Sequence, residues 1–380
     1  FYTALLIAFA VIVLFNSICY IYLGLFTFKS FTAFHKREHY PTSIIICAKN
    51  EAENLKRFLP FICNQVFPVF EVIVVNDGST DNTQNVLLGV KQAFPELRII
   101  KNTNCLGKKA SISKAIELAT YNHLLFTDAD CKPESKYWVQ HMTQNFSENH
   151  TIVLGYSGYK KEKGILNSII RYETVLTALQ YFGMAHHNNA YMGVGRNLAY
   201  TKACFKANKG FNSHKHISSG DDDLFIAEAS TKTNTAISLN KASFTTSLPK
   251  TSLKAWFHQK RRHITTAKRY SFKVKTILAG FYISQLLFWL FCISLLIIQP
   301  YSIVVISLFL VREFIQGFIL YKTFKTLHES ALLLIFPLLE ILLLSVQACL
   351  FITNIVYNVT QTRHQVPGVL LLSQIEVGRS

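Results

Sequence analysis

Two widespread phosphate-binding motifs are missing from this sequence of 380 residues. It has neither G-x-G-x-x-G, which binds dinucleotides, nor G-x-x-x-x-G-K-[ST], the P-loop. Its eight cysteines include no C-x-x-C pair, which argues against a zinc knuckle and a disulfide framework and fits a reducing cytoplasm. Any phosphate that the protein binds must therefore be held by side chains or by a metal ion.

Negative charge is also scarce, because 22 Asp and Glu residues stand against 39 Lys and Arg and the formal net charge is +17. Such an excess can indicate nucleic-acid binding. Here the basic residues crowd beside long apolar segments, so membrane lipids and nucleotide phosphates are the simpler partners, and no nucleic acid is expected. These residues are Lys29, His35, Lys36 and Arg37, and later Lys260, Arg261, Arg262, Lys268, Arg269, Lys273 and Lys275.

Apolar residues make up 50% of the chain and gather at its two ends. Residues 1–28 are nearly uncharged and longer than the ~20 residues that a helix needs to cross a hydrocarbon core. They are too long for the apolar part of a signal peptide, so we expect a retained anchor. Three further stretches, 276–298, 302–321 and 331–355, bring the expected number of membrane spans to four.

The charges around these spans predict how the chain is organised. The positive-inside bias places the middle of the chain in the cytoplasm and predicts an integral protein of the cell (inner) membrane. Arg312 and Glu313, near the middle of the third span, predict either a paired structural interruption or the polar lining of a substrate path. We expect an anchor at 1–28, a cytoplasmic domain at 41–250, an interfacial basic segment at 251–275, about three membrane helices at 276–357 and a tail at 358–380.

The middle of the chain alternates short apolar runs with amphipathic stretches. The runs at 43–48, 71–75, 97–101 and 123–127 have the length and composition of buried parallel strands. This order predicts an α/β fold with a doubly wound, mainly parallel sheet, whose ligands bind at the carboxyl ends of the strands. The helices are expected to begin near Glu51, Asn82, Lys108 and Glu134.

Polar residues follow each of these strands. They occupy 49–51, 76–81, 104–109 and 128–130, and each loop alone could be an ordinary turn before a capped helix. Because the four loops converge on one edge of the sheet, together they predict a binding site.

The most specific of these loops contains Asp128 and Asp130. Carboxylates at positions i and i+2 leave a strand on the same side. Such oxygen ligands suit Mg²⁺ or Mn²⁺ bound between carboxylate and diphosphate, although a solvated loop would also explain an isolated pair. We expect Asp130 to hold the metal, with Asp128 behind it.

Six segments in order resemble the family 2 glycosyltransferases, and in particular the membrane-integrated branch with the hyaluronan, chitin and cellulose synthases. They read SIIICAKNEAENL, VIVVNDGSTDNT, GKKASISKA, FTDADCKP, SSGDDDLF and QKRRH. The resemblance implies a GT-A fold that binds a nucleotide sugar, most often a UDP-sugar. It implies uridine and ribose contacts at Glu51 and Asp77, a further nucleotide contact at Lys108 or Lys109, a metal ligand at Asp130, and the first acid of the family's DxD at Asp128.

The resemblance also places the catalytic base in the run of three aspartates at 221–223, at Asp222, with the register uncertain by one so that Asp221 is an alternative. An acceptor hydroxyl is a poor nucleophile until a carboxylate takes its proton. Adjacent acids repel one another, which raises the proton affinity of one of them. An acidic helix N-terminus stabilised by the helix dipole would also explain the run.

Gln259, Arg262 and His263 resemble the family's QxxRW signature, whose Arg lies against the donor diphosphate. Arg261 would assist Arg262, since planar guanidinium groups suit phosphate oxygens. A basic helix bound to lipid is a compatible alternative. His263 replaces the usual Trp and offers an acceptor sugar a smaller face, which argues against processive synthesis.

The loop 193–198 resembles the acceptor loop of non-processive members. Its Asn197, with the neighbouring Arg196, is expected either to contact donor or acceptor or to form a structural turn.

The sequence therefore predicts a membrane-bound inverting glycosyltransferase. It would move a sugar from a nucleotide sugar to a lipid-linked or membrane-proximal glycan acceptor. A processive polysaccharide synthase is the nearest alternative, and a nucleotide-sugar-binding scaffold without turnover is an alternative of another class.

Overall fold

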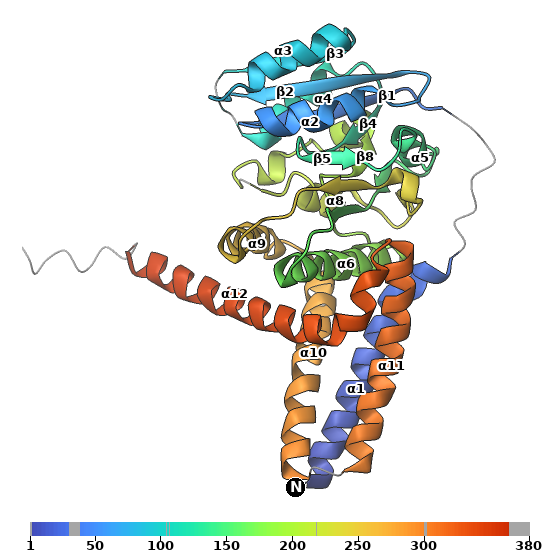
Figure 1. Cartoon of the computed structure of the whole chain (residues 1–380), viewed down its shortest axis with the longest axis vertical. Coiled ribbons are helices and arrows are strands. Elements are labelled where there is room, and N and C mark those ends of the chain that lie inside the picture. Colours follow the sequence, from blue (N-terminus) through green and yellow to red (C-terminus); the bar gives the residue numbers. More distant parts are fainter. Residues whose placement is uncertain are drawn as a thin grey trace, which may run out of the picture.

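The computed structural model describes residues 2–29, 39–103, 105, 107–217, 219–299 and 302–364, with the backbone alone for 263, 265 and 355–364. Residues 35–37, 104 and 365–380, which carry part of the sequence predictions, lie outside this description. A domain of mixed α and β structure stands above a bundle of long apolar helices (Figure 1).

The domain is built on a seven-stranded sheet of order β3-β2-β1-β4-β8-β6-β9. The four predicted strands are confirmed as a parallel set, β3-β2-β1-β4. An unpredicted strand, β8, runs antiparallel to both β4 and β6, and β9 runs parallel to β6, so the sheet is mainly parallel. The bounds are Thr42–Ala48 (β1), Phe70–Asp77 (β2), Leu97–Asn102 (β3), His123–Phe126 (β4), Ile152–Leu154 (β6), Leu198–Thr201 (β8) and Thr235–Ile237 (β9).

The central strand β1 is apolar on both faces because helices cover both sides of the sheet. Ile44 and Ile46 pack in one cluster with Leu55 of α2, and Ile45 packs in another with Ile112 of α4. Burial on two faces explains a continuous run of isoleucines in place of alternation. The helices that cross between these strands are Ala52–Cys63 (α2), Thr83–Ala93 (α3) and Lys108–Leu118 (α4).

The helix expected near Glu134 begins later, at α5 (Trp138–Thr143), because β5 (Cys131–Pro133) intervenes. β5 pairs with β10 (Thr245–Ser247), which also pairs with β7 (Ser157–Tyr159) to form a small second sheet. This sheet follows directly after Asp130 and fixes the end of the loop that carries the two aspartates.

Two longer helices close the lower edge of the domain, α6 (Ile165–His186) and α9 (Leu253–Ala267). Both lie between the sheet and the apolar bundle (Figure 1). Two short helices complete the domain, α7 (Lys202–Ala207) and α8 (Asp223–Ala229), and α8 begins within the run of three aspartates.

Four helices are long and apolar enough to cross a membrane, as the sequence predicts. Three of them pack together as a bundle, and the fourth, α12, runs crosswise between the bundle and the domain (Figure 1). Their bounds are Tyr2–Gly24 (α1, continued by the 3-10 turn Leu25–Phe28), Phe272–Ile298 (α10), Ile303–Thr326 (α11) and Phe336–His364 (α12, preceded by the 3-10 turn Ser330–Ile335).

The charged pair in α11 is buried and satisfied. The Arg312 guanidinium donates to Glu313 at 2.6 Å and to both carboxylate oxygens of Glu340 in α12, at 2.6 and 2.9 Å. The sequence left two alternatives for Arg312 and Glu313, a paired structural interruption and the lining of a substrate path. These contacts match the paired structural interruption.

Candidate active site

Most of the acids expected at the site lie at the carboxyl ends of the parallel strands. Glu51 precedes α2 after β1, Asp77 ends β2, and Asp128 follows β4. Asp77 is buried and accepts hydrogen bonds from the Asn102 side chain at 2.9 Å and from the Gly107 backbone at 3.1 Å. It therefore also fixes the loop that leads into α4.

Lys108, the first residue of α4, joins two of the acidic segments. Its ammonium lies 2.9 Å from Asp128 and 3.0 Å from Asp221. Burial acts against the charge of Lys108, but the two carboxylates outweigh it and hold the pKa of Lys108 well above its usual range. Burial alone would raise the pKa of Asp128. The charges of Lys108, Arg196 and Arg262 outweigh burial and hold this pKa below its usual range.

Asp130 is placed differently from Asp128, because no ion pair joins it to an ammonium group of the described residues. The Ser247 hydroxyl donates to it at 3.1 Å, and the Cys131 thiol lies 3.3 Å from its other oxygen. Burial raises the pKa of Glu51, and the charges of Asp130 and Asp128 raise it further. A hydrogen bond from Asn54 acts in the opposite direction. A concentration of negative charge is what a divalent cation would neutralise.

Within the described part of the chain, no three His, Cys, Asp or Glu side chains are grouped so that they could hold a metal ion by themselves. A cation at Asp130 would thus complete its coordination with phosphate oxygens and water. This is how Mg²⁺ usually binds when it carries a nucleotide, through one or two carboxylates. The donor set therefore fits such an ion.

The three consecutive aspartates have three different partners. Asp221 pairs with Lys108, and Asp223 accepts hydrogen bonds from the hydroxyl groups of Thr266 and Tyr270. Asp222 accepts from backbone N–H groups, those of Gly195 at 2.7 Å and Asp223 at 2.8 Å. Burial, followed by the charges of Asp221 and Asp223, raises the pKa of Asp222 to about 7, although Lys108 and the Gly195 N–H oppose this rise.

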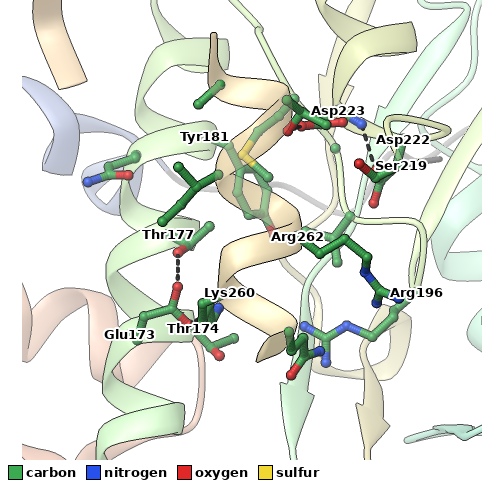
Figure 2. Close-up of a pocket in the computed structure, with 18 of the residues that line it drawn as sticks. Glu173, Thr174, Thr177, Tyr181, Arg196, Ser219, Asp222, Asp223, Lys260 and Arg262 are labelled. Atoms are coloured by element: carbon green, nitrogen blue, oxygen red, sulfur yellow. Dashed lines mark hydrogen bonds and ion pairs between the residues drawn. The ribbon is translucent and has the colours of Figure 1, made fainter. Parts of the chain in front are cut away.

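A cavity of about 540 Å³ opens beside Asp222 and is also lined by residues of the apolar helices. Figure 2 shows the polar and charged residues that line it. Its upper end carries charged groups, among them Asp128, Asp222, Arg196 and Arg262. The Arg196 guanidinium is fixed over the Tyr159 ring, 4.3 Å from its centroid. Its lower wall includes Leu278 of α10 and Leu343, Val346, Gln347 and Leu350 of α12.

The middle of the cavity is lined by polar groups that the sequence analysis missed. Glu173 pairs with Lys260 at 2.5 Å and accepts a hydrogen bond from Thr177 at 3.2 Å (Figure 2). Gln180 lines the same wall. These α6 residues are spaced i, i+4 and i+7, so they share one face of the helix, and this spacing is a signal that could have revealed them. Ser247, the partner of Asp130, belongs to no motif that would have marked it.

Six of the described predicted site residues do not line the cavity, namely Glu51, Asp77, Lys109, Asp130, Asn197 and Arg261. The Lys109 ammonium donates to the backbone carbonyls of His214 and Ile217, at 2.7 and 3.0 Å, so it holds the segment before the three aspartates. Asn197 is fully buried and bonds to Trp138 and to the carbonyls of Tyr156 and Ser243. The structural-turn alternative therefore describes Asn197, because its amide is fully used inside the domain.

The QxxRH segment lies on α9. Gln259 and Arg262 line the cavity, whereas Arg261 is not among its lining residues. The side chain of His263 lies outside the described part of the chain, so its expected acceptor contact stays a prediction. Its backbone is helical.

The mainly parallel sheet, the acidic loop after β4 and the flanking helices define a GT-A type fold. Residues 43–199 match the family model described as "Glycosyl transferase family 2". The resemblance of the sequence motifs to this family is thereby confirmed over these residues.

The curated relatives match over part of their length. Glycosyltransferase AglE of Haloferax volcanii is 30% identical over 115 residues, which are 30% of this chain and 38% of AglE. The UDP-Glc:alpha-D-GlcNAc-diphosphoundecaprenol beta-1,3-glucosyltransferase WfaP of Escherichia coli is 29% identical over 124 residues, 32% of this chain and 47% of WfaP. The matched segments thus span less than half the length of these two relatives.

A solved structure is similar over nearly the whole chain. The mannosyltransferase PcManGT from Pyrobaculum calidifontis, solved in complex with GDP-Man and Mn²⁺, has a TM-score of 0.56 at 17% identity. The likeness covers 88% of this chain and 97% of that one, and it concerns the fold.

Proposed function

We propose that this protein is an inverting glycosyltransferase that transfers a sugar from a nucleotide sugar, preferably a UDP-sugar, to a lipid-linked acceptor at the membrane surface. One observation carries the proposal: a single cavity connects Asp222 to the apolar walls of α10 and α12. A site that reaches from a carboxylate to apolar helices suits a substrate with a reactive hydroxyl at one end and a lipid at the other.

On the donor side, Glu51 and Asp77 are proposed to contact the nucleoside, and Arg262 and Arg196 the diphosphate. A Mg²⁺ or Mn²⁺ ion held by Asp130 would supply positive charge to the leaving diphosphate. Arg262 would stabilise the same developing charge, because a guanidinium group can donate to two oxygens at once. Lys108 holds Asp128 and Asp221 in place and keeps their charges balanced beside the donor.

Asp222 is proposed to act as the base. Its carboxylate would take the proton of the acceptor hydroxyl while that oxygen forms a bond to the anomeric carbon of the sugar. The bond from this carbon to the diphosphate oxygen breaks in the same step, and the nucleoside diphosphate leaves with the bonding electrons. One displacement with one base and no second nucleophile inverts the anomeric centre.

The middle of the cavity favours a sugar as the part of the acceptor that binds there. The Glu173 carboxylate is neutralised by Lys260, and Thr177, Gln180 and Gln259 offer neutral hydrogen-bonding groups. Hydroxyl groups of a sugar match such a surface better than a free phosphate does. The name of the relative WfaP, which acts on a sugar attached to a lipid diphosphate, supports this class of acceptor.

The proposed location is the cytoplasmic face of the cell membrane. The basic residues of α9 and of the start of α10, such as Lys254, Lys268 and Lys273, lie between the domain and the apolar bundle. Basic residues at this position favour the cytoplasmic side, where anionic lipids also attract them.

The acceptor class can be tested with the full chain in lipid nanodiscs, supplied with radiolabelled UDP-sugars and a membrane lipid extract. We expect label to enter the organic phase as a lipid carrying one added sugar. Label in a long water-soluble polymer would show a processive synthase instead. Binding of a donor without any turnover would support the non-catalytic scaffold.

A further inference from the structure

The last apolar helix, α12, lies in a different direction from the other three. Helices α1, α10 and α11 pack along one another, whereas α12 runs crosswise beneath the domain and packs against α6 and α9 (Figure 1). Length and composition predict that the segment 331–355 crosses the membrane, but neither shows the direction in which the helix runs. Its contacts decide that direction.

The beginning of α12 is fixed to the bundle through Glu340. This carboxylate is 1% exposed and accepts hydrogen bonds from Arg312 and Gln316 of α11, the latter at 3.1 Å, and from Trp289 of α10 at 3.2 Å. The Tyr20 hydroxyl of α1 also donates to it, at 3.4 Å, so donors from three helices set the position of the second turn of α12. The helix therefore starts from a defined point in the bundle.

The next turns of α12 lie beneath the domain. Leu343, Val346 and Leu350 line the cavity that also contains Gln259 and Lys260 of the basic helix α9. Ten residues of helix, from Glu340 to Leu350, cover about 15 Å. If α12 crossed the membrane beside the bundle, Leu350 would lie about 15 Å deeper in the hydrocarbon layer than Glu340. The charged groups of α9, which line the same cavity as Leu350, would then be buried in hydrocarbon at a high cost in free energy.

The two faces of α12 differ in exposure but not in polarity. The face toward the domain is buried at Leu339, Leu343 and Leu350, spaced as on one side of a helix. The opposite face exposes Leu338, Ile341 and Ile352, by 54, 41 and 59%. No charged residue occurs between 341 and 362. An exposed face of this composition is continuous with the apolar surface of the bundle, such as Phe314 and Phe318 of α11.

We propose that α12 is not a fourth span: it begins inside the bundle at Glu340 and runs obliquely to the membrane surface, with one face in lipid and the other forming the floor of the cavity. The bilayer covers the exposed face of α12, because this face joins the lipid-facing surface of the bundle and lies beside the basic residues of α9. The end of α12 at His364 then lies on the same side of the membrane as the domain. A fourth span would place it on the opposite side.

The arrangement can be tested by topology mapping of the full chain. Three variants each carry one protease-cleavable epitope tag, after Glu148 on the exposed surface of the domain, after Gln299 between α10 and α11, or at the C-terminal end. In sealed vesicles with the domain outside, we expect protease to remove the first and third tags at similar rates and the second only after detergent is added. Protection of the C-terminal tag together with the tag after Gln299 would show a fourth span and overturn the proposal.

A second arm tests what covers the exposed face. A photo-crosslinking amino acid is placed at Ile352, or at Leu339 as the control, which is buried and does not line the cavity, and the membranes are irradiated. We expect lipid adducts at position 352 in clear excess over position 339. A crosslinked dimer of the chain at position 352, or equal lipid labelling at the two positions, would contradict a lipid-facing surface. Neither arm depends on glycosyl transfer, so the topology can fail while the proposed function stands.

Discussion

The Oδ2 atom of Asp222 lies 2.7 Å from the backbone nitrogen of Gly195 and accepts its hydrogen bond. This contact joins the start of α8 to the loop before β8 and aims one carboxylate of the acidic run at the cavity. The other two carboxylates are held by Lys108 and by the hydroxyl groups of Thr266 and Tyr270. All three aspartates line the cavity, and the partners of Asp221 and Asp223 favour Asp222 as the base, which stays a prediction.

Replacing Asp222 by Asn should abolish transfer with little effect on donor binding. Asn keeps an oxygen for the Gly195 N–H but cannot take a proton, so we expect a loss of at least ~10²-fold in kcat. Nucleotide release in the presence of acceptor reports the rate, and calorimetry with the UDP-sugar reports binding. Turnover near the wild-type rate would place the base elsewhere.

The matched variant is Asp223→Asn, in the neighbouring residue that binds Thr266 and Tyr270. It removes a charge from the contact between α8 and the α9–α10 connection, so we expect a lower Tm with residual transfer above that of Asp222→Asn. The reverse order of activities would assign the two aspartates the opposite roles.

The rate should depend on pH through Asp222. Its pKa is raised to about 7, and a base acts only when deprotonated, so kcat/KM should fall as the pH drops below about 7. The charged groups that act on it are Asp221, Asp223 and Lys108. Lys108→Gln removes the cation that opposes the rise, so the acidic limb should move to higher pH. A move to lower pH in this variant would contradict the assignment.

The sequence predicted the parallel half of the sheet because both faces of these strands are buried, which leaves uninterrupted apolar runs such as that of β1. It did not predict β8, whose four residues carry no sign of direction: antiparallel pairing with β4 and β6 is decided by the path of the chain between them. Strand type was thus readable from local composition, and strand direction was not.

Removing the carboxylate of Asp130 should make the affinity for the donor independent of the metal ion. In the wild type, Mn²⁺ should strengthen UDP-sugar binding, and EDTA should remove the gain. Asp130→Asn should lose most of this gain because a neutral amide is a weaker ligand for a hard cation. Ser247→Ala, which removes only the hydroxyl that bonds to Asp130, is the control and should retain it. An undiminished Mn²⁺ effect in Asp130→Asn would sink the metal assignment.

Arg262 should contribute to donor affinity through the diphosphate. A charged hydrogen bond is worth about 1.5–3 kcal/mol, so Arg262→Ala should weaken UDP binding by roughly 10- to 150-fold. Lys268→Ala removes an exposed cation near the end of α9 that does not line the cavity, and it should leave the affinity nearly unchanged. Equal effects of the two substitutions would indicate a general charge effect and not a diphosphate contact.

Asn197→Ala should reduce stability more than it affects the chemistry. The amide bonds to Trp138 and to two backbone carbonyls, and removing it leaves these buried groups unpaired, at a cost on the order of 3 kcal/mol. Thermal unfolding should show a Tm lower by roughly 5–10 °C. Asn85→Ala, at an exposed helix position, should change little. A normal Tm together with a raised KM for the acceptor would instead support the predicted contact between Asn197 and the acceptor.

The sequence also located most of the charged groups of the site, but not how each is used. Lys108 and Lys109 are neighbours in a motif, and only the helical turn decides that Lys108 reaches the aspartates while Lys109 binds backbone carbonyls. The orientation of α12 is undetermined for a similar reason, since an apolar helix has the same composition whether it crosses the membrane or lies in its surface.

The central claim is tested most directly by nucleotide release from a panel of nucleotide sugars, using purified full-length protein with Mn²⁺ and membrane lipids and Asp222→Asn as the paired sample. The account predicts that one UDP-sugar releases UDP at a rate at least ~10²-fold above the paired sample and that the sugar appears on lipid. Release from no donor in the panel, or equal release by the wild type and Asp222→Asn, would contradict it.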